Sequence, residues 1–254
     1  MKLVFCGSAG AIQTADNANV SFCIIQRNHS ILVDASGNPT QNLLKTGIDP
    51  AALDALILTH SHPDHLYALP SLVHNLWLLK RKRPLSILCN QDTKTKAEAL
   101  IELFSLFTRK AMFPMAWEVL EDGIFHGIPG VKIALFPANH PVPTCGVKIS
   151  TAASSLVYSA DTAPSQRLIK EALGATVLIH EASGGVQNEK DFNEHGHSSV
   201  RQAAEAGRAS GVKRLFICHI DVRYAASPDD LLAAAGEIFK GEVIIPKLFE
   251  AYEI

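Results

Sequence analysis

Short apolar runs alternate with polar turns through the first half of the chain, a pattern that predicts β-strands. The runs cover residues 2–6, 20–26, 30–34, 55–60, 85–89, 132–137, 145–150 and 155–160. One segment breaks the pattern after Pro70, where apolar residues recur at three- and four-residue spacing from Leu72 to Leu79. This spacing predicts one helix among the strands, and Pro70 suits its first turn.

Helical and strand patterns alternate in the second half of the chain. Helices are predicted at residues 163–174, 198–210 and 227–241, with Ser198 as a candidate N-cap, and strands at 176–180, 214–220, 242–246 and 248–254. No linker, charge block or low-complexity segment divides the sequence. We therefore expect a single α/β domain over residues 1–254, with its strands in the middle layers.

Charge and cysteine content narrow the class of protein. The 23 Lys and Arg residues nearly balance 25 Asp and Glu residues, so the chain lacks the overall basic field of a dedicated nucleic-acid binder. The five cysteines are scattered and form no C-x-x-C pair, which predicts reduced thiols in the core. With no apolar run long enough for a membrane span and no signal-peptide pattern, we expect a soluble cytoplasmic protein.

The stretch LTHSHPDHLYALP carries the densest chemistry. His60 and His62 follow an apolar run two residues apart, so both can reach one ion. Asp64 and His65 come after the turn at Pro63 and can approach the same cavity from another direction. Such a concentration of metal-ligand residues predicts a metal site with two halves.

Further ligand candidates end three other apolar runs: His140, Asp161 and His219. Taken alone, a histidine after a strand is more often a hydrogen-bonded residue at the rim of a sheet. Because the chain also contains H-S-H-P-D-H, these three residues are better interpreted as metal ligands. Imidazoles with carboxylates suit zinc, and iron or manganese is the alternative.

This set of residues resembles the metallo-β-lactamase superfamily. THSHPDH matches its H-x-H-x-D-H signature, and the later candidates follow in the same order along nearly the whole chain. The resemblance implies a four-layer αββα sandwich with two divalent metal ions at one edge. It assigns His60, His62 and His140 to one ion, Asp64, His65 and His219 to the other, and Asp161 to a bridging position.

A narrower resemblance is to ribonuclease Z, the tRNA 3′-processing endonuclease. The segments LIHEAS, HGHSSVRQAAE and RLFICHIDVRY are similar to its H-E-A-T, H-S-T and T-H-I-S-x-R-Y motifs. This implies a phosphodiesterase in which a metal-bridging hydroxide, oriented by Asp64, attacks phosphorus, while His197, paired with Glu181, protonates the leaving oxygen. His180 is interpreted as structural, and the role of His195 is left open.

The resemblance is incomplete on the substrate side. Only 20 residues, 141–160, separate His140 from Asp161, and they predict a tight hairpin where bacterial ribonuclease Z carries a long tRNA-gripping arm. The N-terminal segment has Asn17 and Asn19 and lacks the family's arginine-bearing turn. Residues 80–83 are basic and are interpreted as a solvated helix end rather than as phosphate contacts. The expected substrate is a small phosphodiester or an RNA 3′-end.

Two other functions remain open at this stage. The same metal site could hydrolyse a lactone or thioester, although Asp161 argues against a true β-lactamase. A non-catalytic metal-binding protein is a further alternative, which the intact set of ligands disfavours. A homodimer is also open, because Trp77, Leu78, Leu103, Phe104 and Phe107 could form a subunit contact, although their helical spacing favours the core.

Overall fold

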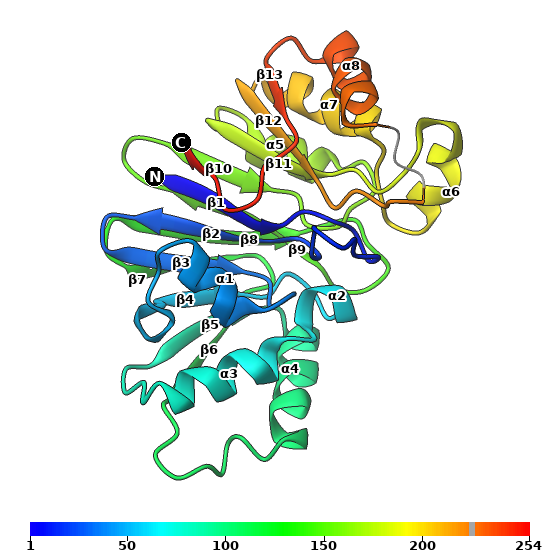
Figure 1. The fold of residues 1–254 in the computed structure, drawn as a ribbon. Helices are drawn as coiled ribbons and strands as arrows, with labels where there is room; N and C mark the ends of the chain where they lie inside the picture. Colours follow the sequence, from blue (N-terminus) through cyan, green and yellow to red (C-terminus); the bar gives the residue numbers. More distant parts are fainter. Residues whose placement is uncertain (224–226) are drawn as a thin grey trace.

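Strands from both halves of the chain build two sheets, as seen in the computed structural model, which describes residues 1–223 and 227–254 (Figure 1). The first sheet has the order β14-β1-β2-β3-β4-β5-β6. Its strands are β1 (Lys2–Gly7), β2 (Ser21–Gln26), β3 (His29–Val33), β4 (Ala55–Ile57), β5 (Leu85–Cys89), β6 (Met115–Val119) and β14 (Ala251–Glu253). The C-terminal strand thus lies beside the N-terminal one.

The second sheet has the order β13-β12-β11-β10-β9-β8-β7. Its strands are β7 (Gly123–Ile128), β8 (Val131–Pro137), β9 (Cys145–Ser150), β10 (Ser155–Tyr158), β11 (Val177–Glu181), β12 (Arg214–Cys218) and β13 (Glu242–Ile244). Each sheet is antiparallel in one part and parallel in the other, with β3 to β6 parallel in the first and β10 to β13 in the second. Parallel neighbours require crossover connections, which the helices provide.

The helices cover the outer faces of the two sheets (Figure 1). They are α1 (Pro39–Lys45), α2 (Pro63–Leu66), α3 (Leu69–Leu78), α4 (Gln91–Leu103), α5 (Gln166–Ala172), α6 (Glu189–Glu194), α7 (Val200–Ser210) and α8 (Pro228–Ile238), with short 3₁₀ turns at η1 (Pro50–Ala52) and η2 (Val186–Asn188). No helix among the described residues is long and apolar enough to cross a membrane.

Alternation along the strands creates three separate cores. On β2, Phe22 and Ile24 point between the sheets, where they meet residues of the second sheet such as Ile133. Cys23, between them, points outward into the core under α1, α3 and α4. A third core lies between the second sheet and α5, α7 and α8. A strand that is buried on both faces must sit in a middle layer, and this confirms the αββα architecture.

Most of the predicted strands and the helices of the second half are confirmed. The prediction of one helix in the first half is wrong, because α1, α2 and α4 also form there. The sequence of α4 is mostly polar, so its amphipathic pattern is weak. The helix buries only a narrow stripe formed by Thr93, Ala97 and Ile101. The N-cap of α7 is Ser199 rather than Ser198, and Gln202 completes a capping box with it.

The basic run at residues 80–83 is only partly solvated. Arg81 is buried and donates hydrogen bonds to the carbonyl oxygens of Ala51, Arg83 and Pro84. Arg83 forms an ion pair with Asp54. Half of this run is therefore structural, and the prediction of a fully solvated helix end is wrong.

The apolar residues considered for a subunit contact are largely exposed. Leu103 is 74% exposed, and Leu78, Phe104 and Phe107 also face outward, so of the two alternatives the core is excluded for these four. The five cysteines are all free and buried, as predicted.

Candidate metal centre and active site

The candidate residues gather where the strands of both sheets end. His60 and His62 follow β4, and Asp64 and His65 lie in α2, where Pro63 occupies the first helical position. The others follow strands of the second sheet: His140 after β8, Asp161 after β10, and His219 after β12. The carboxyl ends of the parallel strands meet at this edge, so residues separated by up to 159 positions come together.

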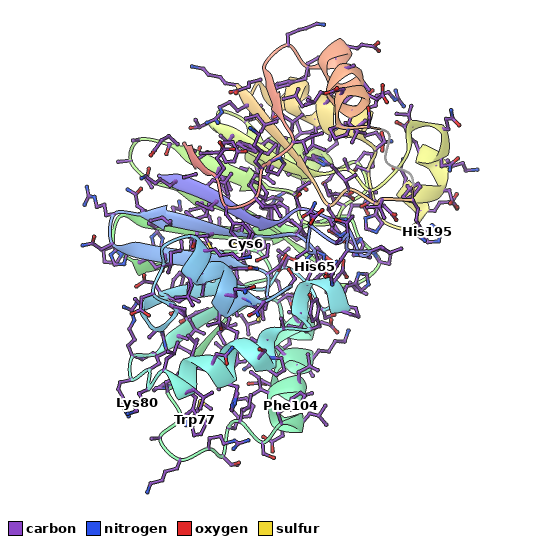
Figure 2. The ribbon with its side chains drawn as sticks, in the orientation of Figure 1. Cys6, His65, Trp77, Lys80, Phe104 and His195 are labelled. Carbon is purple, nitrogen blue, oxygen red and sulfur yellow. The ribbon has the colours of Figure 1, made fainter. Side chains whose placement is uncertain are left out.

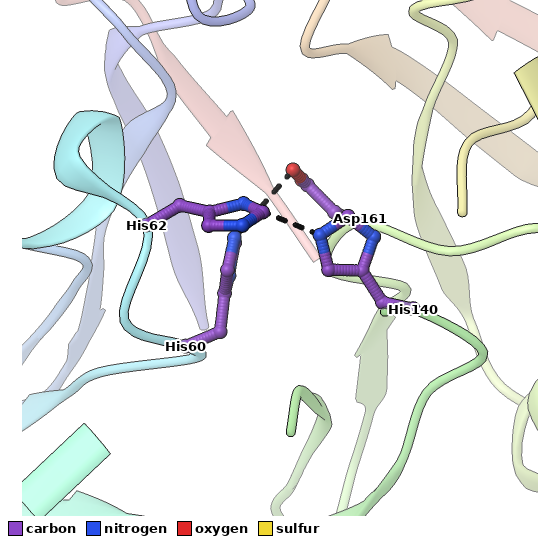
Figure 3. Close-up of side chains that lie close together, drawn as sticks. All are labelled: His60, His62, His140 and Asp161. Atoms are coloured by element: carbon purple, nitrogen blue, oxygen red, sulfur yellow. Dashed lines mark hydrogen bonds and ion pairs between the residues drawn. The ribbon is translucent and has the colours of Figure 1, made fainter. Parts of the chain in front are cut away.

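A first group of side chains consists of His60, His62, His140 and Asp161 (Figure 3). Their candidate ligand atoms all lie within 4.8 Å of one another. His140 Nε2 is 3.3 Å from His62 Nδ1, and His60 Nε2 is 3.7 Å from Asp161 Oδ2. The three imidazoles and the carboxylate therefore converge on one small volume.

A second group consists of Asp64, His65 and His219, whose ligand atoms also lie within 4.8 Å of one another. Asp64 Oδ2 is 3.4 Å from His65 Nε2 and 3.3 Å from His219 Nε2. Asp161 Oδ2 is 3.5 Å from His65 Nε2 and 3.3 Å from His219 Nε2. Asp161 thus touches both groups and lies between them.

A buried carboxylate that the sequence reasoning missed orients one histidine of each group. Asp34 Oδ2 accepts a hydrogen bond from His65 Nδ1 at 2.8 Å. The Thr59 hydroxyl donates to Asp34 at 3.0 Å and lies 3.1 Å from His60 Nδ1, from which it can accept. Both imidazoles are therefore oriented with Nε2 towards the cluster.

Two further partners fix the remaining rings. His219 Nδ1 lies 2.6 Å from Ser183 Oγ, and the same hydroxyl donates to the His219 carbonyl oxygen at 2.9 Å. His140 Nδ1 donates to the Gly196 carbonyl oxygen at 2.9 Å. Gly196 has a φ of +80°, and an added Cβ would lie 2.6 Å from His140 Nδ1, so only glycine fits this approach.

The backbone is strained at three non-glycine positions of the site. Asp34, Ala160 and His219 have φ values of 59°, 51° and 53°. This region costs L-residues on the order of 1–3 kcal/mol each, and it persists where the surroundings impose it. The strain aims Asp34 at His65, turns the chain just before Asp161, and points His219 into the cluster.

The donor set fits divalent cations. Buried His60 Nε2, His65 Nε2 and Asp161 Oδ1 have no hydrogen-bond partner among the described residues, and leaving such atoms unpaired is costly. Burial and the charge of His65 lower the pKa of His60 well below its usual value, so its imidazole is neutral and can act as a ligand. Imidazole nitrogens with carboxylate oxygens are the ligands that zinc prefers.

The carboxylates of the cluster are ionised. Burial would raise the pKa of Asp161, but the charges of His219 and His65 outweigh it and hold that pKa well below its usual value. The same balance holds for Asp64, because the neighbouring His219 and His65 side chains hold its pKa well below its usual value despite burial. The centre therefore presents negative charge to a cation.

His197 and Glu181 form an ion pair beside the cluster. His197 Nδ1 donates to Glu181 Oε1 at 3.1 Å. Glu181 is fully buried at the end of β11 and also accepts from the backbone amides of Thr162, Ser183 and Ser198. Burial disfavours charge on His197, but the hydrogen bond that His197 donates to Glu181 outweighs it and raises the pKa of His197 to about 9. The imidazole is thus protonated at neutral pH.

Other residues singled out in the sequence lie outside the cluster. His180 is buried, with its Nδ1 2.7 Å from the carbonyl oxygen of Glu181. His195 is exposed on the rim of the site, and its Nδ1 contacts the Asp191 carbonyl oxygen (Figure 2). Asn17 and Asn19 hold the N-terminal loop through Ser8 and Gly10. Tyr224, at the end of the third ribonuclease Z-like segment, lies outside the described residues.

A family model described as "Beta-lactamase superfamily domain" matches residues 29–220, about three quarters of the chain. The chain belongs to this superfamily. Among curated superfamily relatives, it is 26% identical to "Ribonuclease Z" of Haloarcula marismortui, over 96% of this chain and 94% of that protein. It is 25% identical to "Ribonuclease BN" of Escherichia coli, over 88% of this chain and 90% of that one.

Solved structures of the superfamily show the same fold. The metallo-β-lactamase-fold protein YhfI of Bacillus subtilis superposes with a TM-score of 0.83 at 24% identity, covering 99% of this chain and 98% of that one. The short form of human tRNase Z superposes with a TM-score of 0.82 at 20% identity, covering 100% and 99%. This superfamily member is a metallo-β-lactamase-fold hydrolase related to ribonuclease Z, and its His/Asp cluster is compatible with a metal site.

Proposed function

We propose that residues 1–254 form one hydrolase domain that cleaves a phosphodiester, either a small one or an RNA 3′-end, with two divalent metal ions. The single observation that carries this proposal is the His197–Glu181 pair, in which an imidazole lies beside the His/Asp cluster with its Nδ1 3.1 Å from a buried carboxylate oxygen. Similarity to proteins named ribonuclease Z supports the same reaction class. Zinc is the proposed metal, and manganese or iron is the alternative.

The residues divide into two ligand sets. His60, His62 and His140 would hold one ion, Asp64, His65 and His219 the other, and Asp161 both. The unpartnered nitrogens of His60 and His65 support this division. When bound, the ions supply Lewis-acid chemistry, in that they neutralise charge on phosphoryl oxygens and lower the pKa of water.

Asp64 is the carboxylate placed to orient the attacking water. Its side chain is 14% exposed, against 2% for Asp161, so it is the one that reaches the open side of the cluster. A carboxylate in this position accepts a hydrogen bond from the water and so orients it for attack on phosphorus.

His197 would protonate the leaving oxygen. Its side chain is 20% exposed and its ring stacks on that of His219 at 5.6 Å, so it lies over the cluster and still faces the cavity. Glu181 holds Nδ1 and thereby directs the Nε2 proton outward. A positioned general acid of this kind contributes about 10²–10⁴-fold to the rate.

The test is hydrolysis of bis(p-nitrophenyl) phosphate by zinc-loaded protein, with His60→Ala as the matched control. We expect p-nitrophenol release by the wild type and its loss in the variant. No release by protein that binds metal would overturn the proposal and make a lactone or thioester the leading substrate.

A further inference from the structure

Two cavities share part of their walls, and the nearer one adjoins the His/Asp cluster. The near lobe, of 340 Å³, is lined by His197 and His219 and by residues of α6. The far lobe, of 440 Å³, lies between the 182–188 segment, the start of α7 and the first turns of α8. Ser183, Asp221 and Arg223 line both lobes. The two lobes are therefore neighbours, and the far lobe lies on the side of the near lobe away from the cluster.

The far lobe has the composition of a pocket for an organic group. Val200, Leu231 and Ala234 give it an apolar wall, and Gly184 and Gly185 expose backbone. Polar groups sit at the edges, among them the amide side chains of Gln187 and Asn188. Ligand pockets of about 300–1,000 Å³ commonly combine apolar walls with a few polar groups in this way.

The charges on the walls disfavour a phosphate in the far lobe. Among the described residues that line it, Arg223 is the one cation, and its Nε lies 3.0 Å from Asp221 Oδ1 while Nη2 lies 2.5 Å from Oδ2. Asp230 adds a second carboxylate, which accepts from Ser227 Oγ at 2.7 Å. An anionic ligand would meet two carboxylates against one neutralised guanidinium.

We propose that the far lobe binds the uncharged nucleoside of the leaving group, so that the preferred substrate is a phosphodiester with a terminal nucleoside on its leaving side. The inference rests on the proposed function, because His197 places the leaving oxygen in the near lobe. In the reaction, water oriented by Asp64 forms the new P–O bond and releases its proton to solvent. The P–O bond to the nucleoside breaks, and the leaving oxygen takes the proton of His197.

The position of an added phosphate tests the charge argument. The reference substrate is adenylyl-adenosine. Two comparison substrates carry an extra phosphate, one on the first nucleoside and one on the second. Product analysis identifies which nucleoside leaves. We expect the phosphate to raise KM at least tenfold on the leaving nucleoside, with little effect on the retained one. An equal effect at both ends would overturn the charge argument.

Variants of the far lobe test its role directly. Ala234→Phe fills the lobe, and Ala233→Phe, on the adjacent exposed position of α8, is the matched control. We expect Ala234→Phe to raise KM for adenylyl-adenosine about tenfold, a loss of about 1.4 kcal/mol in binding. Ala233→Phe should keep the wild-type KM for the dinucleotide and the wild-type turnover of bis(p-nitrophenyl) phosphate. Should Ala234→Phe fail to fold, Val186→Trp on the exposed rim of the lobe replaces it.

Removing a carboxylate completes the test. Asp230→Asn should narrow the KM difference caused by the phosphate on the leaving nucleoside, whereas Asp229→Asn, next to it but outside the lobe, should not. If wild-type protein cleaves bis(p-nitrophenyl) phosphate but Ala234→Phe leaves the dinucleotide KM unchanged, this inference fails and the proposed function stands. If no phosphodiester is cleaved, the proposed function fails. Calorimetry with adenosine then tests the far lobe alone. Binding by the wild type that is lost in Ala234→Phe supports the lobe, and no binding by the wild type overturns it.

Discussion

Asp34 Oδ2 lies 2.8 Å from His65 Nδ1, deep in the protein at the end of β3. Through the Thr59 hydroxyl the same carboxylate also reaches His60, so one residue supports histidines of both ligand groups. No motif contains Asp34, yet the orientation of the cluster depends on it. A buried acid that fixes imidazole tautomers acts on metal affinity without touching the metal.

Replacement of Asp34 with Asn should weaken metal binding. The amide has the same shape but no negative charge, so it is a weaker acceptor for the hydrogen bonds that His65 and Thr59 donate. We therefore expect zinc affinity to fall about 10–100-fold. Competition with a chelator measures this loss. Asp49→Asn, at an exposed cap of η1, is the control and should bind zinc as the wild type does. Unchanged affinity in Asp34→Asn would show that the ligands need no such support.

Replacement of His197 with Ala should separate catalysis from metal binding. Loss of a general acid should lower kcat by about 10²–10⁴-fold while zinc content stays near the wild-type value. Kinetics on bis(p-nitrophenyl) phosphate and metal analysis of the same sample measure both quantities. His126→Ala, on the exposed face of β7, is the control. An equal loss of zinc and activity would assign His197 to the ligands instead.

Gly196→Ala should disturb His140 specifically. The new Cβ would lie 2.4 Å from Pro141 Cδ and 2.6 Å from His140 Nδ1, so the ring must move. Gly174→Ala is a matched control, since its φ of +72° imposes a similar backbone penalty with no atom within 4 Å. We expect weaker zinc binding in Gly196→Ala alone. Similar zinc affinity in the two variants would refute the contact argument.

Arg81→Ala should destabilise the fold without a direct effect on chemistry. Its guanidinium satisfies three carbonyl oxygens in a buried position, and their loss should cost about 2–4 kcal/mol in the free energy of unfolding. Urea denaturation measures this cost, with the exposed neighbour Lys82→Ala as control. A solvated role for Arg81, as the basic run suggested, predicts no difference between the two.

Local patterns in the sequence determined the strand layers and the ligand candidates. Apolar runs buried on both faces predict middle strands, and H-S-H-P-D-H places four donors on one short turn whatever the rest of the chain does. The structure brings all seven predicted ligands to one edge, because five of them follow strands whose ends were visible in the pattern and Asp64 and His65 follow His62 directly in the chain.

Only the tertiary structure revealed what surrounds these ligands. Asp34, Thr59, Ser183 and Gly196 are ordinary residues in sequence, and they acquire their roles from contacts across up to 56 positions. α4 escaped prediction because its buried stripe is narrow, and Arg81 because basic side chains rarely lie inside. Hydrophobic periodicity is a local property and can be seen in the sequence itself, whereas hydrogen bonds between distant segments form only once the sheets have packed.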